Sequence, residues 1–273
     1  MSLSKKKEQE LIEQVKKNPM SLKEIENQTP AICLAAFEQN WRVFEYVNYQ
    51  TEEMCLEVVE QDYEMLDFVK NQTPKICEVA LNLDWRALEF VRDQTEEMCL
   101  EVVKRDWEAL RFVNDQTETV CLEAIKQSCY ALDLVRDQTE KICLEAVKQE
   151  GAALQFVQNQ TELICLEAVK QDGYALQFVE EQTDRVCLEA MKQSVWGFRF
   201  VKNQTEEICL EAMKQNMYML SHVKERTKEM ERIKKILEED ILLSYRETRY
   251  DLVAGEIDLN HSPYHVLEQL YSY

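Results

Sequence analysis

The sequence predicts an all-α fold: an α-solenoid of nine 22-residue two-helix repeats with helical N- and C-terminal caps. The first observation is a threonine that recurs every 22 residues without insertion or deletion, at 29, 51, 73, 95, 117, 139, 161, 183, 205 and 227. The second is a cysteine four residues after each of the first nine threonines, at 33, 55, 77, 99, 121, 143, 165, 187 and 209. A fixed period of this length is typical of stacked arrays in which each repeat contacts only its neighbours.

Each threonine begins the first predicted helix of its repeat, because an N-cap hydroxyl followed by Pro or an acidic residue is a helix start signal. Position n of a repeat denotes the nth residue after its threonine. Positions 3, 4, 7 and 8 are apolar, as in Ile164, Cys165, Ala168 and Val169. That spacing places one continuous buried face on the helix.

The second predicted helix begins at position 11, where eight of the nine residues are preferred N-caps. Positions 14, 15, 17 and 18 are apolar, as in Ala175, Leu176, Phe178 and Val179. Helices of about ten and about eight residues do not persist alone in water, so stacking of neighbouring repeats is expected to stabilise them.

The two ends depart from the repeat. Residues 1–28 read as a degenerate N-terminal capping repeat, whose second helix starts at Asn18-Pro19; residues 29–226 form the solenoid, and residues 227–273 a helical C-terminal cap. The cap is expected to begin with an amphipathic helix, and Ser262-Pro263 to start a last one. The inward residues of the first of these are predicted to be Met230, Ile233, Ile236, Leu237, Ile241 and Leu242.

The net charge of −20 favours a partner with a basic surface and disfavours direct binding of nucleic acid, which requires Lys and Arg on the docking face. No apolar run approaches the roughly 20 residues of a membrane span, and no secretion signal opens the chain. The sequence therefore predicts a cytoplasmic protein that does not enter membranes.

The nine equivalent cysteines are expected to be free, buried thiols. Helices in neighbouring repeats pack about 8–10 Å apart, beyond the roughly 7 Å limit for a disulfide. The paired spacing of zinc-binding cysteines is also missing. We expect no metal and no cofactor at these positions.

Two polar rows recur beside the apolar positions. Glu at position 6 and Lys at position 9 form pairs three residues apart, as expected for a solvated face. Gln stands directly before the threonine and again at position 10. Because its amide both donates and accepts, we expect these side chains to satisfy backbone groups of the turns, with ligand contact as the alternative.

The exposed face of the second helix varies most between repeats, and we take it as the candidate partner-binding site. Its aromatic residues are Trp41, Tyr63, Trp85 and Trp107 at position 12, and Tyr130, Tyr174, Trp196 and Tyr218 at position 13. Acidic residues accompany them, among them Glu64, Asp67, Glu89, Asp133 and Glu181. A row of aromatic and acidic side chains of this kind can bind a basic segment through apolar and cation–π contacts. The alternative is that the rings pack between adjacent repeats.

These features favour a non-enzymatic protein-binding scaffold, with no catalytic residue, that holds a basic protein or peptide on its second helices. One alternative is an acidic nucleic-acid mimic that inhibits a nucleic-acid-binding defence enzyme, as a virus-encoded protein would. A second alternative is a metal-dependent enzyme in the C-terminal segment, centred on Asp258, His261 and His265.

The repeat reads Asn-Gln-Thr-x-x-[Ile/Met/Val]-Cys-Leu-Glu-Ala-[Val/Met]-Lys-Gln, followed by Ala-Leu-x-[Phe/Leu]-Val. It resembles an uncharacterised family of tandem helical repeats, domain of unknown function 4116, found in bacteria, protists and giant viruses of amoebae. The resemblance covers residues 29–226. It implies a helical repeat fold, and no activity, cofactor or catalytic residue.

Overall fold

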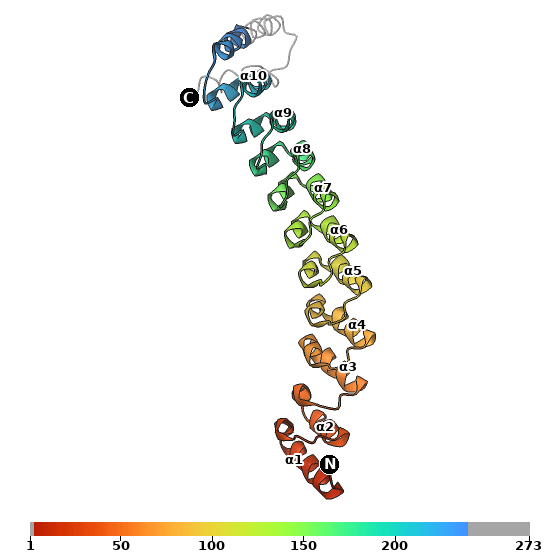
Figure 1. Cartoon of the computed structure of the whole chain (residues 1–273). Helices are drawn as coiled ribbons and strands as arrows, with labels where there is room; N and C mark the ends of the chain where they lie inside the picture. The colour runs from red at the N-terminus through yellow and green to blue at the C-terminus, as the bar shows by residue number, and fades with distance from the viewer. Residues whose placement is uncertain (1–2, 240–273) are drawn as a thin grey trace, which may run out of the picture. The chain divides into compact units, whose positions relative to one another are not determined.

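The structure, a computed structural model, describes residues 3–239. The chain divides into two compact parts, Met1–Asp137 and Gln138–Tyr273, here called the N-terminal half and the C-terminal half and described separately. All regular elements of the described residues are helical, and α-helices alternate with 3₁₀ helices, labelled η. Within each half the α-helices lie in one row and the η helices in another (Figure 1). The predicted α-solenoid of 22-residue helix pairs is confirmed.

The α-helices are α1 (Lys5–Lys17), α2 (Pro30–Phe37), α3 (Glu52–Gln61), α4 (Pro74–Leu83), α5 (Glu96–Arg105), α6 (Glu118–Gln127), α7 (Glu140–Gln149), α8 (Glu162–Gln171), α9 (Asp184–Gln193) and α10 (Glu206–Gln215). The η helices are η1 (Pro19–Glu24), η2 (Trp41–Tyr46), η3 (Tyr63–Phe68), η4 (Trp85–Phe90), η5 (Trp107–Phe112), η6 (Cys129–Leu134), η7 (Gly151–Phe156), η8 (Gly173–Phe178), η9 (Val195–Phe200) and η10 (Met217–His222).

The second helix of each repeat is where the sequence predicts it, but it is a six-residue 3₁₀ helix and not an α-helix of about eight residues. One residue joins the two helices of a repeat. Asp172 is at once the C-cap of α8 and the N-cap of η8, with an extended backbone. Its N–H donates to Ala168, and its carboxylate accepts from the Tyr174 N–H at 2.9 Å. Val179 then closes the last turn by donating to Leu176.

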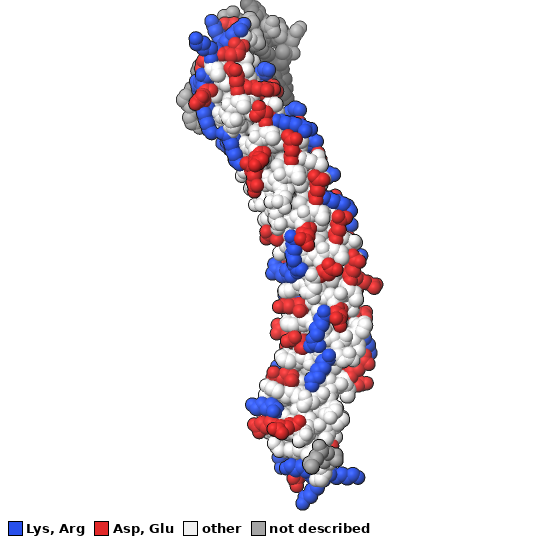
Figure 2. Space-filling view, in the orientation of Figure 1, with Lys and Arg blue, Asp and Glu red and all other residues white. Residues whose placement is uncertain are grey.

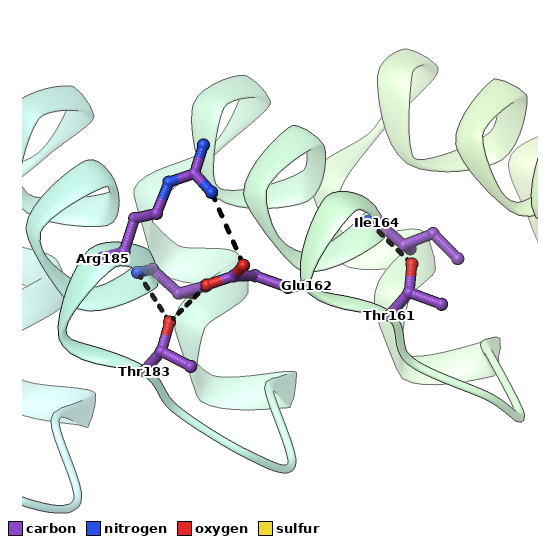
Figure 3. Close-up of polar contacts among 6 residues, drawn as sticks. Thr161, Glu162, Ile164, Thr183 and Arg185 are labelled. Carbon is purple, nitrogen blue, oxygen red and sulfur yellow. Dashed lines mark hydrogen bonds and ion pairs between the residues drawn. The ribbon is translucent and has the colours of Figure 1, made fainter.

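Each repeat threonine caps its α-helix as predicted. The Thr161 hydroxyl accepts from the Ile164 N–H at 3.3 Å (Figure 3), and the same bond recurs at all ten threonines. At several repeats the hydroxyl also donates to the position-1 glutamate of the preceding repeat, as from Thr183 to Glu162 at 3.0 Å and from Thr117 to Glu96 at 2.7 Å. This second bond, here called the threonine clasp, ties the starts of successive α-helices together.

The glutamine before each threonine clamps two successive turns. Gln94 donates to the carbonyl oxygens of Leu88 at 2.9 Å and Phe112 at 2.8 Å, and accepts from the Asn114 N–H at 2.8 Å. This confirms the expectation that these amides satisfy backbone groups. A donated bond 18 residues on and an accepted bond 20 residues on are made by Gln28, Gln50, Gln72, Gln94, Gln116, Gln138, Gln160, Gln182 and Gln204.

Two position-10 glutamines also hydrogen-bond to backbone carbonyls of the preceding repeat, at the C-terminal end of the α-helix. The Gln127 amide donates to the Val103 carbonyl of the preceding repeat, and the Gln171 amide donates to the Gln149 carbonyl at 3.2 Å. The last carbonyls of an α-helix have no partner within the helix. Gln127 and Gln171 therefore satisfy such carbonyls from the next repeat.

All ten cysteines are free and buried, as predicted for the nine repeat positions. Burial raises the pKa of the Cys55, Cys121 and Cys187 thiols to about 11. Burial also raises the pKa of five further thiols: Cys77, Cys99, Cys143, Cys165 and Cys209. At neutral pH these side chains therefore pack as small uncharged groups.

The ends agree with the prediction in part. The α1–η1 pair precedes the first repeat, with Asn18 and Pro19 at the start of η1. At the other end, residues 228–239 are helical and Met230 is buried. Ile236 is 47% exposed, so its inward assignment was wrong. Ile241, Leu242 and the helix predicted after Ser262-Pro263 lie outside the described residues. No described helix combines the length and apolar character that crossing a bilayer requires.

Replacing Gln94 by Ala should lower the free energy of unfolding by about 2–3 kcal/mol, because it leaves backbone groups of two turns without their partner. Urea unfolding followed by circular dichroism measures the change. The control Gln61→Ala alters an exposed side chain and should cost less than about 0.5 kcal/mol. Equal losses in the two variants would contradict the clamp.

Alkaline pH should destabilise the fold through the buried thiols. Their pKa is raised on folding, so the folded state keeps protons that the unfolded state loses above about 8.5. Stability is therefore full below about pH 8.5 and declines toward pH 11, by at most about 1.4 kcal/mol per thiol per pH unit. Unfolding free energies measured across this window should fall less steeply in a triple Cys55→Ala, Cys121→Ala, Cys187→Ala variant. Identical slopes would show that the thiols are not responsible.

Candidate protein-binding surface

The predicted site lies on the η helices. Positions 12, 13, 16 and 20 supply its side chains, here called the η face. Positions 14, 15 and 18 of the same segments point into the core, as with the fully buried Leu176. Because both the cap at position 11 and the valine at position 18 are fixed by backbone hydrogen bonds, the direction of each exposed side chain is fixed as well.

The four rings at position 12 are half-buried in the N-terminal half. Tyr63 packs on Phe90 of the next repeat, with ring centroids 6.4 Å apart, and Trp85 packs on Phe112 at 5.9 Å. The structure thus places these two rings as the packing alternative describes. Trp41 and Trp107 are half-buried in the equivalent positions.

Two of these rings already carry a cation from their own chain. The Arg42 guanidinium lies 4.6 Å from the centroid of Trp41, and that of Arg86 lies 5.5 Å from Trp85. A hydrogen bond with Tyr63 and the charge of Asp84 raise the pKa of Arg86 further. A basic partner would have to displace these arginines before using the same ring faces.

The rings at position 13 are more exposed. Tyr174 is 38%, Trp196 40% and Tyr218 42% exposed in the C-terminal half, and Tyr130 is exposed in the N-terminal half. Tyr174 contacts Phe200 at 6.0 Å, Trp196 contacts Tyr218 at 6.0 Å, and Tyr218 contacts His222 at 5.5 Å. These five side chains of η8, η9 and η10 are here called the aromatic stripe.

In η8, glycine at position 12 accompanies the change of ring position. A Cβ atom on Gly173 would lie 2.5 Å from the Ala190 carbonyl oxygen, and one on Gly151 would lie 2.5 Å from that of Ala168. At these steps the η helix therefore approaches the next α-helix too closely for any side chain. The aromatic residue of the η8 segment stands one position later, where it faces solvent. Sequence reasoning missed this reason for η8, although Gly173 signals it.

Most of the predicted acidic site residues lie on other η helices than the aromatic stripe. Four acidic residues are exposed on η3, η4 and η6 of the N-terminal half: Glu64, Asp67, Glu89 and Asp133. In the same half, Tyr63 and Trp85 pack on phenylalanines of the next repeat, and Arg42 covers Trp41. Beside the aromatic stripe the exposed residues at position 16 are Gln177, Arg199 and Ser221, and Glu181 follows at position 20. The structure therefore brings acidic groups and rings together in parts and not as one uniform ladder.

Many cations of the chain are held in place by their own neighbours. Lys202 at position 19 donates to the carbonyls of Val179 at 2.7 Å and Glu180 at 2.9 Å, and Arg92 and Arg136 bind the preceding turns in the same way. On the α-helices, Lys170 pairs with Glu167 at 2.8 Å, which confirms the predicted solvated pairs. Lys and Arg alternate with Asp and Glu over the face that Figure 2 shows.

Three comparisons with known proteins were negative: no family model, no curated protein and no solved structure matches the chain. The resemblance to domain of unknown function 4116 remains a prediction. Within residues 3–239, no group of three or more potential metal ligands lies close together. Asp258, His261 and His265, which the metal-enzyme alternative needs, lie outside the described residues.

The two kinds of ring should differ in solvent access. We expect acrylamide to quench the fluorescence of Trp196 more strongly than that of Trp85, because only the latter is packed on a phenylalanine and covered by an arginine. Variants in which the other tryptophans are replaced by phenylalanine, leaving only Trp196 or only Trp85, allow the measurement. Equal quenching would contradict the described packing.

Proposed function

We propose that this chain is a non-enzymatic scaffold that binds a segment of a basic protein along its η face. The observation that carries the proposal is the aromatic stripe, in which Tyr174, Trp196 and Tyr218 of three successive repeats are exposed and each contacts another aromatic side chain. Monomeric proteins seldom leave large aromatic rings in contact with one another at the surface without a partner.

The stripe is suited to binding because its rings are held before a partner arrives. Each of the three rings contacts another aromatic side chain, and the buried Phe198 lies in the helix between Trp196 and Phe200. Little side-chain entropy is therefore lost on association, and Trp and Tyr are the residues that contribute most at interfaces. The amides of Gln177 and Asn203 offer hydrogen bonds beside the rings.

Charge supports a basic partner. The chain carries −20 overall, and several of its η-side cations already donate to backbone carbonyls. Exposed Glu64, Asp67, Glu89 and Asp133 remain available on the N-terminal half. The ten free, buried cysteines support a reducing, cytoplasmic location.

The aromatic contacts can be tested on whatever protein the chain captures from cells of its source organism. The double variant Tyr174→Ala, Trp196→Ala should weaken binding of that protein by about tenfold or more, because interface energy concentrates in such rings. Titration calorimetry of the purified pair measures it. Leu163→Ala is the matched control, since it shortens an exposed apolar side chain on α8, away from the η face. Unchanged affinity in the double variant would overturn the proposal.

The same experiment separates the scaffold from the nucleic-acid mimic. Binding led by aromatic contacts should change modestly with salt, whereas a mimic should weaken steeply with salt and compete with DNA or RNA for its target. Competition by nucleic acid together with unchanged affinity of the ring variant would support the mimic.

A further inference from the structure

The α-helix row of the C-terminal half contains a second surface that the η face does not include. A groove of about 1020 Å³ is lined by residues of α9 and α10. The half-buried Leu188 and Leu210, at position 5 of their repeats, supply its apolar surface. Charged side chains form its two ends.

At the step between α9 and α10 the threonine clasp is missing, as it is at the steps after Pro30 and Pro74, which offer no carboxylate at position 1. Thr161 donates to Glu140 and Thr183 to Glu162, but position 1 of α9 is Asp184. The aspartate is one methylene shorter, and no hydrogen bond joins it to Thr205 among the described residues. Arg185 is drawn the other way, toward Glu162 of α8 at 3.5 Å (Figure 3).

The shape of the groove favours a helix over an extended peptide. Both walls are α-helices whose backbone groups are hydrogen-bonded internally, so they offer an extended segment no edge to pair with. A helix satisfies its own backbone and needs only an apolar stripe for contact with the two leucines. With ten residues, α9 and α10 each span about 15 Å, the length of three helical turns.

The charges fix an orientation. Asp184, Glu206 and Glu207 lie at the end formed by the helix N-termini, and Lys192 and Lys214 at the opposite end. The lysines pair with Glu189 at 2.9 Å and Glu211 at 3.9 Å. Arg185, the only cation at the first end among the described residues, is engaged by Glu162. The first end is thus negative and complements a basic segment.

We infer that this groove binds a short amphipathic helix of a partner protein, antiparallel to α9 and α10. Its apolar stripe would contact Leu188 and Leu210, and lysines or arginines in its last turn would face Asp184, Glu206 and Glu207. Basic residues are favourable in the last turn of a helix, and antiparallel neighbours have opposed dipoles, so each feature supports the other.

The probe is a fluorescein-labelled synthetic peptide of about 14 residues, with leucines at helical spacing, glutamates in the first turn and lysines in the last. Fluorescence anisotropy with the full chain should show saturable binding. A second peptide with the two charged turns exchanged should bind more weakly. Absence of saturable binding by the first peptide, or equal affinity of both, would overturn the inference.

Leu188→Glu should weaken binding of the first peptide by about tenfold or more, because it sets a charge against the apolar stripe. The fold tolerates this change, since Glu78 stands at the same position of α4. Leu144→Glu on α7 makes the same change outside the groove and should leave binding unaltered. Equal affinity of the Leu188 variant and the unaltered chain would overturn the inference.

Asp184→Glu tests the origin of the groove, because it keeps the charge and restores the methylene that the threonine clasp needs. It should stabilise the chain against urea and weaken peptide binding. Trp196→Ala on the η face should leave peptide binding unchanged, so failure of this groove and failure of the proposed η-face scaffold are separate results. Loss of peptide binding in the Trp196 variant would instead place the peptide on the aromatic stripe and overturn the groove.

Discussion

The glutamine clamp is the constraint on which the rest of this structure depends. One amide donates to a carbonyl 18 residues on and accepts from an N–H 20 residues on, so both partners must keep their distance along the chain. An inserted or deleted residue within a repeat would move both partners away and leave polar backbone groups unpaired. This explains in physical terms why the 22-residue period is unbroken over nine repeats. It also explains the small cysteine at position 4, whose sulfur reaches the same amide oxygen, as Cys33 does with Gln28 at 3.1 Å.

Positions that take no part in the glutamine clamp vary between repeats. The residue at position 12 affects how closely neighbouring repeats approach each other. A glycine at position 12 brings η8 against the Ala190 carbonyl, and the ring of that segment then stands outside the core. A tryptophan at the same position, as in Trp85, packs instead on the phenylalanine of the next repeat. At position 1, Glu162 reaches the next threonine, whereas Asp184 is one methylene shorter and makes no hydrogen bond to Thr205 among the described residues. The surfaces that differ from the regular pattern are therefore products of single substitutions at otherwise repetitive positions.

Much of this could be predicted from the sequence, because helix starts, apolar spacing and recurring glutamines each depend on residues within one repeat. The 3₁₀ geometry of the second helix could not, since apolar residues at positions 14, 15, 17 and 18 fit either kind of helix. The exposure of the rings could not either. Whether Tyr63 packs and Tyr174 is exposed depends on how near the backbone of the next repeat lies, and the glycines report that only once the neighbour is known. The groove at α9 and α10 could not be predicted either, because its lining residues come from two helices whose packing distance the sequence does not give.

In the proposed function, the net charge and the aromatic stripe contribute to binding in different ways. In the proposed function, long-range attraction from a chain of net charge −20 speeds encounter with a basic partner. Exposed pairs such as Lys170 and Glu167 are screened by salt and contribute little to the lifetime of the complex. The aromatic stripe behaves oppositely, because its rings are already ordered by contacts such as that between Trp196 and Tyr218. In the proposed complex, the stripe contributes to the binding free energy after the partner has met the chain, when water is displaced from the rings. Under the proposed function, acidic residues on η3, η4 and η6 and rings on η8 to η10 would therefore serve successive stages of one association and would not need to lie on one surface.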